Sequence, residues 1–479
     1  MSLIVLVFFA LGSFAGFVPP PPTRSIQITQ PVDHNVPPST RATFQETVLL
    51  YEKFWRTSSL PIDERPIIVT MGGEAPVRGG YDHNGMLFEW GSKIGALLVF
   101  PEHRYFGASM PFGTNSHTRQ NVQYLSVDQA LRDYVEVISQ IRQQFGTNVA
   151  PVIAVGGSYP GELAAYIRAN FPNDVDMALA ASAPIGPFVS QYGFWRVASA
   201  DFAGSARQCA TIIRQAFVET AAAFNSGDPT PVINGLALCQ QSSASAQRDI
   251  VRWVENAFAT FAMLDYPYAA NDLPPNPAQA ACDATETTFA TSGNAIEALL
   301  SAVNVVYNTT SAPVQCHDIE AEAPSNCIDP TGCGTGSDGM SWDYLCCVSE
   351  TAKLGTNNVT DVFPPKSFDL TAVNKYCNRV WGITPDLQFP EHYANFANAT
   401  NIIFSNGYLD PWEPLGFLKS PNPGKIVTLQ AFGAAHHLDL RGSDPADSKS
   451  VVQMRALEQQ ILSQWLNSTI ALKRAARVH

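Results

Sequence analysis

The sequence predicts an α/β fold with a doubly wound, largely parallel sheet. Two observations carry this prediction. Short apolar runs rich in β-branched residues alternate along the chain with longer stretches in which apolar residues recur at helical spacing. The apolar runs are also continuous rather than alternating, as expected for strands that are buried on both faces of a parallel sheet.

The ends of the chain and its composition indicate a globular protein of the secretory route. Of the 479 residues, 46% are hydrophobic and 15% are charged, which is typical of globular rather than disordered proteins. Residues 1–15 form a short apolar run that ends in Ser13-Phe14-Ala15, the pattern of a signal-peptidase site, so we expect a signal peptide there. No later stretch predicts membrane insertion, and we expect a secreted or lysosomal protein.

The first part of the predicted sheet domain covers residues 16–190. The patterns predict strands at residues 42–51, 66–70, 96–100, 151–155 and 177–181, with helices at 126–145 and after Ser158. Ser126 and Gln129 have the spacing of a capping box at the start of the first of these helices. The run Glu102-His103-Arg104 follows a strand, and we expect it to form a structural ion pair under the neighbouring loops.

Residues 191–390 are expected to form an inserted helical cap. Helical periodicity continues here without intervening strands, and all nine cysteines fall between residues 209 and 377. This clustering predicts up to four disulfides and one cysteine left over. The cysteine spacings do not form two CxxC pairs, so neither zinc nor another metal is expected.

Residues 391–479 return to the earlier pattern and complete the sheet domain. Two apolar runs predict strands at residues 402–404 and 426–429, and residues 451–466 predict a closing helix. The formal net charge of the whole chain is −13, and the sequence contains no run of lysine or arginine. This charge excludes nucleic acid as an expected partner.

A serine marks the point where one strand turns into a helix. The strand 151–155 stops at Gly156-Gly157, Ser158 follows, and a helix begins almost at once. This is the setting of a nucleophile elbow, in which a hydroxyl is held at the end of a sheet. The alternative is a glycine turn with Ser158 as an ordinary helix N-cap. Pro160 stands where the motif Gly-x-Ser-x-Gly has its second glycine, although a first helical turn tolerates proline.

Two later loops supply the groups that such a serine needs. Asp410 follows the strand 402–404, and the pair His436-His437 follows the strand 426–429. Serine, aspartate, histidine is the chain order of α/β-hydrolases, in which a neutral imidazole takes the serine proton and the carboxylate orients the imidazole. A lone Asp-Pro, as in Asp410-Pro411, is otherwise a common turn.

Several stretches resemble one family, that of lysosomal Pro-X carboxypeptidase and dipeptidyl peptidase II, the post-proline-cleaving serine exopeptidases. The matching stretches cover nearly the whole chain after residue 15: Val32-Asp33-His34, residues 102–109, Gly156-Gly157-Ser158-Tyr159, residues 263–268, Trp342-Asp343-Tyr344, residues 405–412 and residues 435–441. The sequence departs from the family pattern at Pro160, at residues 72–75 and at residues 413–415.

The resemblance implies an α/β-hydrolase with a disulfide-rich helical cap domain, no cofactor and no metal. It assigns Ser158 as nucleophile, Asp410 as the triad acid and His436 as general base. The substrates it implies are peptides with a proline near one terminus, and it also implies a homodimer. Whether the enzyme is a carboxypeptidase or a dipeptidyl peptidase stays open. The other classes considered are a binding protein on a hydrolase fold that has lost catalysis, and an esterase or lipase.

Further site residues are expected around the triad. The backbone N–H groups of Tyr159 and Gly73 are candidates for the oxyanion hole. Trp412 is either a wall of a proline-sized pocket or a buried support of its loop, and Glu74 either binds a substrate amine or is structural. We expect His437 beside the base, with Arg441 or Asp439 near it. Glycosylation sequons occur at four positions: Asn308, Asn358, Asn398 and Asn467.

Overall fold

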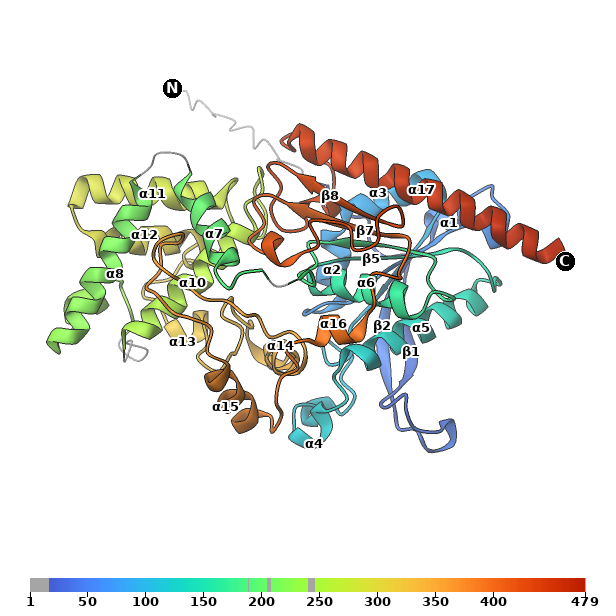
Figure 1. Cartoon of the computed structure of the whole chain (residues 1–479), viewed down its shortest axis with the longest axis horizontal. Helices are drawn as coiled ribbons and strands as arrows, with labels where there is room; N and C mark the ends of the chain where they lie inside the picture. Colours follow the sequence, from blue (N-terminus) through green and yellow to red (C-terminus); the bar gives the residue numbers. More distant parts are fainter. Residues whose placement is uncertain (1–16, 188, 205–207, 240–245, 479) are drawn as a thin grey trace, which may run out of the picture.

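A computed structural model describes residues 17–478 with the exception of residues 188, 205–207 and 240–245. The predicted signal peptide, residues 1–15, lies outside the described residues. Figure 1 shows a sheet covered by helices on both faces and, at one end of it, a group of helices that includes α7, α8 and α10 to α13. Within the described part of the chain, no helix is both long enough and apolar enough to cross a membrane.

The sheet has eight strands in the order β1-β2-β4-β3-β5-β6-β7-β8. Strands β1, β2 and β4 pair antiparallel with their neighbours, and every other neighbouring pair is parallel. The strands are β1 Arg24–Pro31, β2 Thr43–Tyr51, β3 Ile67–Thr70, β4 Leu97–Pro101, β5 Val152–Gly157, β6 Met177–Ala181, β7 Ile402–Gly407 and β8 Ile426–Ala431.

Strand β1 was not predicted from the sequence. Its outer half alternates between exposed and partly buried residues, because it lies at the edge of the sheet and pairs with β2 alone. A short edge strand of this kind lacks the continuous apolar run by which buried strands are recognised.

The helices frame this sheet in chain order. They are α1 Lys53–Thr57, α2 Val77–His83, α3 Gly85–Ile94, α4 Arg119–Val122, α5 Val127–Gln144, α6 Tyr159–Asn170, α7 Gly193–Ala203, α8 Cys209–Ser226, α9 Thr230–Gly235, α10 Gln247–Met263, α11 Pro277–Ser292, α12 Ala295–Tyr307, α13 Ile319–Glu322, α14 Gly336–Val348, α15 Leu370–Val380, α16 Phe389–Tyr393 and α17 Lys449–Val478. The closing helix is longer than the predicted 451–466.

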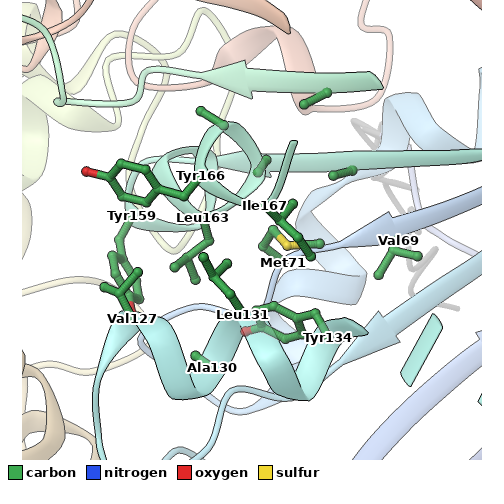
Figure 2. Close-up of a cluster of buried hydrophobic side chains, with 14 of the residues drawn as sticks. Val69, Met71, Val127, Ala130, Leu131, Tyr134, Tyr159, Leu163, Tyr166 and Ile167 are labelled. Carbon is green, nitrogen blue, oxygen red and sulfur yellow. The ribbon is translucent and has the colours of Figure 1, made fainter. Parts of the chain in front are cut away.

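Helices α5 and α6 cover one face of the sheet. Val69 of β3, Leu131 of α5 and Leu163 of α6 are fully buried in one apolar cluster, which Figure 2 shows in close-up. On the other face, Leu462 and Leu466 of α17 belong to a second cluster. Burial of this kind contributes about 1.5–3 kcal/mol for each large side chain and holds α6 against the sheet.

The capping box predicted for α5 is only half formed. The Ser126 hydroxyl accepts a hydrogen bond from the Gln129 backbone N–H. The Gln129 side chain does not reach back to Ser126, because it accepts from the His34 N–H at 2.9 Å and donates to Asp33 at 2.8 Å. A contact across the fold has therefore replaced the local one.

The predicted ion pair at Arg104 is present. Its guanidinium donates to both carboxylate oxygens of Asp133, at 2.6 and 2.8 Å, and both side chains are buried. Glu102 accepts from the Val77 and Ala108 backbone N–H groups and so holds two loops at the end of the sheet. These residues support the loops rather than form a charged site of their own.

Helices α7 to α15 lie between β6 and β7 in the chain, and α7 to α12 share an apolar cluster separate from those of the sheet. Four disulfides occur in this interval, the number predicted, and Cys346 is a buried free cysteine. The bonded pairs are Cys209–Cys282, Cys239–Cys316, Cys327–Cys333 and Cys347–Cys377. A mostly parallel eight-stranded sheet with helices on both faces, a strand-to-helix elbow and this disulfide-rich helical insertion form an α/β-hydrolase fold.

Candidate active site

Ser158 lies in a strained turn between β5 and α6. Its backbone has φ 64° and ψ −135°, a conformation that residues with a side chain rarely adopt. The Ser158 N–H donates to the Ala181 carbonyl at 2.9 Å, and the Ser158 carbonyl accepts from the Gly161 and Glu162 N–H groups. These bonds hold the strained turn in place, as in a nucleophile elbow.

Close packing explains the glycine pair before the serine. A Cβ atom on Gly156 would lie 2.0 Å from the Pro160 carbonyl oxygen, and one on Gly157 would lie 2.8 Å from the Cβ of His437. Pro160 lies in the first turn of α6, where its missing N–H leaves no helical hydrogen bond unmade. The departure from Gly-x-Ser-x-Gly is therefore compatible with the elbow.

Asp410 and His436 are joined by a hydrogen bond. Asp410 follows β7 and is fully buried, and its Oδ1 lies 2.9 Å from Nδ1 of His436, which follows β8. The same Oδ1 accepts from the Trp412 backbone N–H at 2.9 Å. A carboxylate at Nδ1 favours the tautomer in which Nε2 carries no proton and can accept one.

The helical cap holds the histidine loop, which the sequence analysis did not anticipate. The His436 N–H donates to the Met263 carbonyl at 3.1 Å, and the Tyr266 hydroxyl donates to the His436 carbonyl at 2.8 Å. Met263 and Tyr266 belong to the stretch 263–268 that carries part of the family resemblance. The resemblance was the available signal, but a motif alone does not tell which loop it supports.

His437 lies beside His436 and is buried. The two ring centroids are 4.6 Å apart, the His437 backbone has φ 39°, and its N–H donates to the Ser182 hydroxyl at 2.8 Å. Burial lowers the pKa of His437 well below its usual value, and the nearby charges of His436 and Arg441 lower it further. His437 is therefore a neutral imidazole at physiological pH.

Arg441 contacts an aromatic ring of the cap. Its guanidinium carbon lies 4.9 Å from the centroid of the Tyr266 ring, and one of its nitrogens donates to the Tyr266 hydroxyl at 3.4 Å. Asp439 accepts a hydrogen bond of 2.6 Å from the Ser405 hydroxyl. Arg441 thus acts on the histidine loop through Tyr266, the residue that binds the His436 carbonyl.

One cavity brings several predicted site residues together. Its volume is about 340 Å³, and its lining includes Gly73, Glu74, Ser158, His436 and His437. Tyr159 is the first residue of α6, where N–H groups have no acceptor within the helix. A Cβ atom on Gly73 would lie 2.7 Å from the Pro160 ring, so only glycine allows this loop to approach the elbow closely.

Glu74 titrates unusually. Burial raises the pKa of Glu74 to about 7, although the positive charge available at His436 opposes the shift. The carboxyl therefore changes charge near neutral pH, in the same cavity as Ser158. A perturbed carboxyl in a cleft is a frequent feature of functional sites.

A second, smaller pocket opens beside Ser158. Its volume is about 110 Å³, and Tyr159, Trp342 and Trp412 contribute aromatic rings to it. Trp412 also packs edge-on against Phe194, with ring centroids 4.8 Å apart. The tryptophan therefore both lines the pocket and supports its loop. The sequence analysis missed the acidic lining of this pocket, because Glu162 and Glu350 come close only in the folded chain.

Two clusters in the described residues have the atom spacing of metal ligands. They are Cys209, Cys282 and Glu286, and Cys327, Cys333 and Asp343. In each cluster the two cysteines form a disulfide, so neither cluster can supply thiolates to a metal. The four sequon asparagines, Asn308, Asn358, Asn398 and Asn467, are all exposed.

Comparisons with known proteins agree with this geometry. Residues 30–458 match the model of the family described as serine carboxypeptidase S28. Lysosomal Pro-X carboxypeptidases of Homo sapiens and Pongo abelii are each 32% identical over 440 residues, which cover 89% of this chain and 85% of the relative. The crystal structure of proline iminopeptidase from Mycobacterium smegmatis aligns over 92% of this chain and 99% of that one, with 13% identity and a TM-score of 0.38.

The family match covers most of the chain and includes the elbow, the Asp410 loop and the histidine loop. The identity to the lysosomal Pro-X carboxypeptidases extends over nearly the same length. The chain therefore belongs to the serine carboxypeptidase S28 family and is a serine-type peptidase.

Proposed function

We propose that this peptidase is a serine exopeptidase that hydrolyses the bond after proline near one end of a peptide, through the triad Ser158, Asp410 and His436. The observation that carries the proposal is the 2.9 Å hydrogen bond between His436 and Asp410 in a cavity that Ser158 also lines. The name of the relatives, Pro-X carboxypeptidase, supports the preference for proline.

The proposed reaction proceeds through an acyl-enzyme. The Ser158 Oγ attacks the carbonyl carbon while Nε2 of His436 takes the hydroxyl proton, and Asp410 stabilises the resulting imidazolium. His436 then gives this proton to the leaving amine as the peptide bond breaks. A water molecule, deprotonated in turn by His436, attacks the acyl carbon and releases Ser158.

The proposed oxyanion hole consists of the backbone N–H groups of Tyr159 and Gly73. Both residues adjoin the elbow, and Tyr159 begins α6, so the positive end of the helix dipole supports negative charge there. Donors of this kind are worth about 2.7–4 kcal/mol each in comparable enzymes. Trp412 is proposed as a wall of the proline pocket.

The proposal extends to organisation and location. Residues 191–390 form the cap domain between two parts of the hydrolase domain, 16–190 and 391–479, and the mature protein begins after residue 15. Location in the lysosome or outside the cell is supported by the names of the relatives. A homodimer and glycans at the four sequons complete the proposal.

A fluorophosphonate probe tests the nucleophile. We expect the purified mature protein to be labelled at Ser158 and the Ser158→Ala variant to remain unlabelled. Absence of labelling would favour a binding protein that has lost catalysis. Labelling combined with turnover of short acyl esters, but not of proline peptides, would favour an esterase.

The end of the peptide that the enzyme reads needs a separate experiment. A peptide with proline at both the second and the penultimate position offers both bonds to the enzyme. Mass spectrometry of its products distinguishes release of an N-terminal dipeptide from release of a single C-terminal residue.

A further inference from the structure

The pocket of about 110 Å³ beside Ser158 combines aromatic walls with an acidic lining. The rings of Tyr159 and Trp342 lie 5.4 Å apart, edge to face. Among the lining residues that the structure describes, four are acidic and one is a lysine: Glu162, Asp329, Glu350, Glu391 and Lys353. Such a lining attracts cations and repels carboxylates.

Two of these acids form a hydrogen-bonded pair. Glu162 lies on α6 one turn after Ser158, and its side chain is 3% exposed. Its carboxyl is hydrogen-bonded to that of Glu350, which also accepts from the Ser349 hydroxyl at 2.6 Å. Two carboxyls bond in this way only when one of them holds a proton, so the pair carries a single negative charge.

The pair, unlike its neighbour Asp329, lacks donors. The Asp329 carboxylate accepts from the Thr331 N–H at 2.8 Å and from the Trp342 indole N–H at 2.9 Å. By contrast, Oε2 of Glu162 is buried and receives no hydrogen bond from any N–H or O–H donor within the described residues. A buried carboxylate oxygen without a donor is unfavourable, and a donor brought by a ligand would relieve that cost.

We propose that the Glu162–Glu350 pair binds an ammonium group of the substrate in the pocket beside Ser158. The inference rests on the proposed function, because the substrate must place its scissile carbonyl at Ser158. The aromatic walls suit the apolar part of the residue that carries the ammonium, and they add cation–π attraction. Two sources share this chemistry: the α-ammonium at the start of a peptide and the side chain of a lysine.

Acid pH should weaken this binding. Burial and mutual repulsion raise the pKa of Glu162 well above its usual value, and burial also raises the pKa of Glu350. As the pH falls, a second proton neutralises the pair, and the charge that attracts the ammonium disappears. The other titratable groups around the pair are Glu74, Asp329, Lys353, Glu391, Tyr159 and Tyr166.

Three amide substrates test the inference: Ala-Pro-p-nitroanilide, its N-acetyl form, and N-acetyl-Lys-Pro-p-nitroanilide. We expect acetylation of the first to lower kcat/KM roughly 10- to 100-fold, the range for a hydrogen bond to a charged group. Activity retained by the lysine substrate would identify the side-chain ammonium as the source, and activity lost would identify the α-ammonium. Either result supports the inference.

Variants tie the preference to the pair. Glu162→Gln should reduce the ratio between free and acetylated substrate to about one, chiefly through KM, and Glu350→Gln is the second variant should the first not fold. Glu391→Gln is the matched control, because Glu391 lines the same pocket but is exposed. The control should keep the ratio of the unmodified enzyme.

The same comparison can be made without turnover. Calorimetry with the Ser158→Ala variant measures the Kd of Ala-Pro-Ala and of its N-acetyl and N-acetyl-lysyl counterparts. Equal Kd values for all three, or an equal effect of Glu162→Gln and Glu391→Gln, would overturn the inference. Absence of fluorophosphonate labelling at Ser158 would instead overturn the proposed function and leave this binding comparison as the test of the pocket.

Discussion

The hydroxyl of Tyr266 donates a hydrogen bond of 2.8 Å to the backbone carbonyl of His436. Tyr266 follows α10 in the helical cap, whereas His436 follows the last strand of the sheet. The Tyr266 ring also receives the Arg441 guanidinium, 4.9 Å from its centroid. The cap therefore helps to position the proposed general base, in addition to covering the site.

The Tyr266→Phe variant tests this positioning. Removal of the hydroxyl costs about 1 kcal/mol of stability, and the looser histidine loop should lower kcat roughly 10-fold with little change in KM. Steady-state kinetics and the rate of fluorophosphonate labelling measure the effect. Tyr268→Phe is the control, because the buried Tyr268 hydroxyl has no hydrogen-bond partner within the described residues. Equal loss in both variants would show that the bond to His436 carries no positioning role.

The two adjacent histidines should differ strongly in their effect on activity. His436→Ala is expected to lower kcat by several orders of magnitude, because it removes the proposed base. His437→Ala should cost about 10- to 100-fold, through lost packing against Gly157. The pKa of His437 is held far below its usual value, so this variant should leave the shape of the pH–rate profile unchanged. A larger loss for His437→Ala would reverse the assignment of the base.

Asp201 should make the folded state sensitive to alkaline pH. Burial, together with the charges of Asp265 and Asp410, raises the pKa of Asp201 to about 9. The folded protein therefore retains a proton that the unfolded chain releases above about pH 4, and the free energy of unfolding falls as the pH rises from 4 to 9.

The Asp201→Asn variant has no such proton to retain. It should be more stable than the unmodified protein by roughly 2 kcal/mol at pH 7, and the gain should shrink at pH 5. Urea denaturation at the two pH values measures both differences. A gain independent of pH would mean that the carboxyl of Asp201 is not protonated in the folded state.

The Cys347–Cys377 disulfide links α14 to α15 and closes a loop with a sequence separation of 30 residues. Replacing both cysteines with serine should lower the free energy of unfolding by about 3 kcal/mol, since the unfolded chain regains that freedom. The substrate KM should also rise, because α14 carries Trp342 of the pocket beside Ser158. Cys346→Ser is the control, since Cys346 is buried but forms no disulfide. Equal unfolding energies for control and double variant would contradict the prediction.

Local patterns in the sequence were enough to predict the sheet domain, its interruption by a disulfide-rich helical segment, and the order of Ser158, Asp410 and His436. These features depend on neighbouring residues: continuous apolar runs mark buried strands, and polar residues directly after them mark the edge of the sheet where sites form. The strands predicted at 66–70, 96–100 and 177–181 match β3, β4 and β6 to within one residue.

Tertiary contacts decided what local patterns could not. The Gln129 side chain left its predicted capping box for Asp33 and His34, because a partner from a distant segment lies within reach. Strand β1 exists through its pairing with β2 rather than through its own apolar content.

The site shows the same division. The sequence by itself determined which residue types stand after the strands, since each lies within a few residues of a recognisable strand. Only the folded chain decided that Asp410 bonds His436, that Tyr266 holds the His436 carbonyl across 170 residues, and that Glu162 pairs with Glu350. Such contacts arise when distant segments are packed together, and the spacing of residues along one segment carries no information about its partner in space.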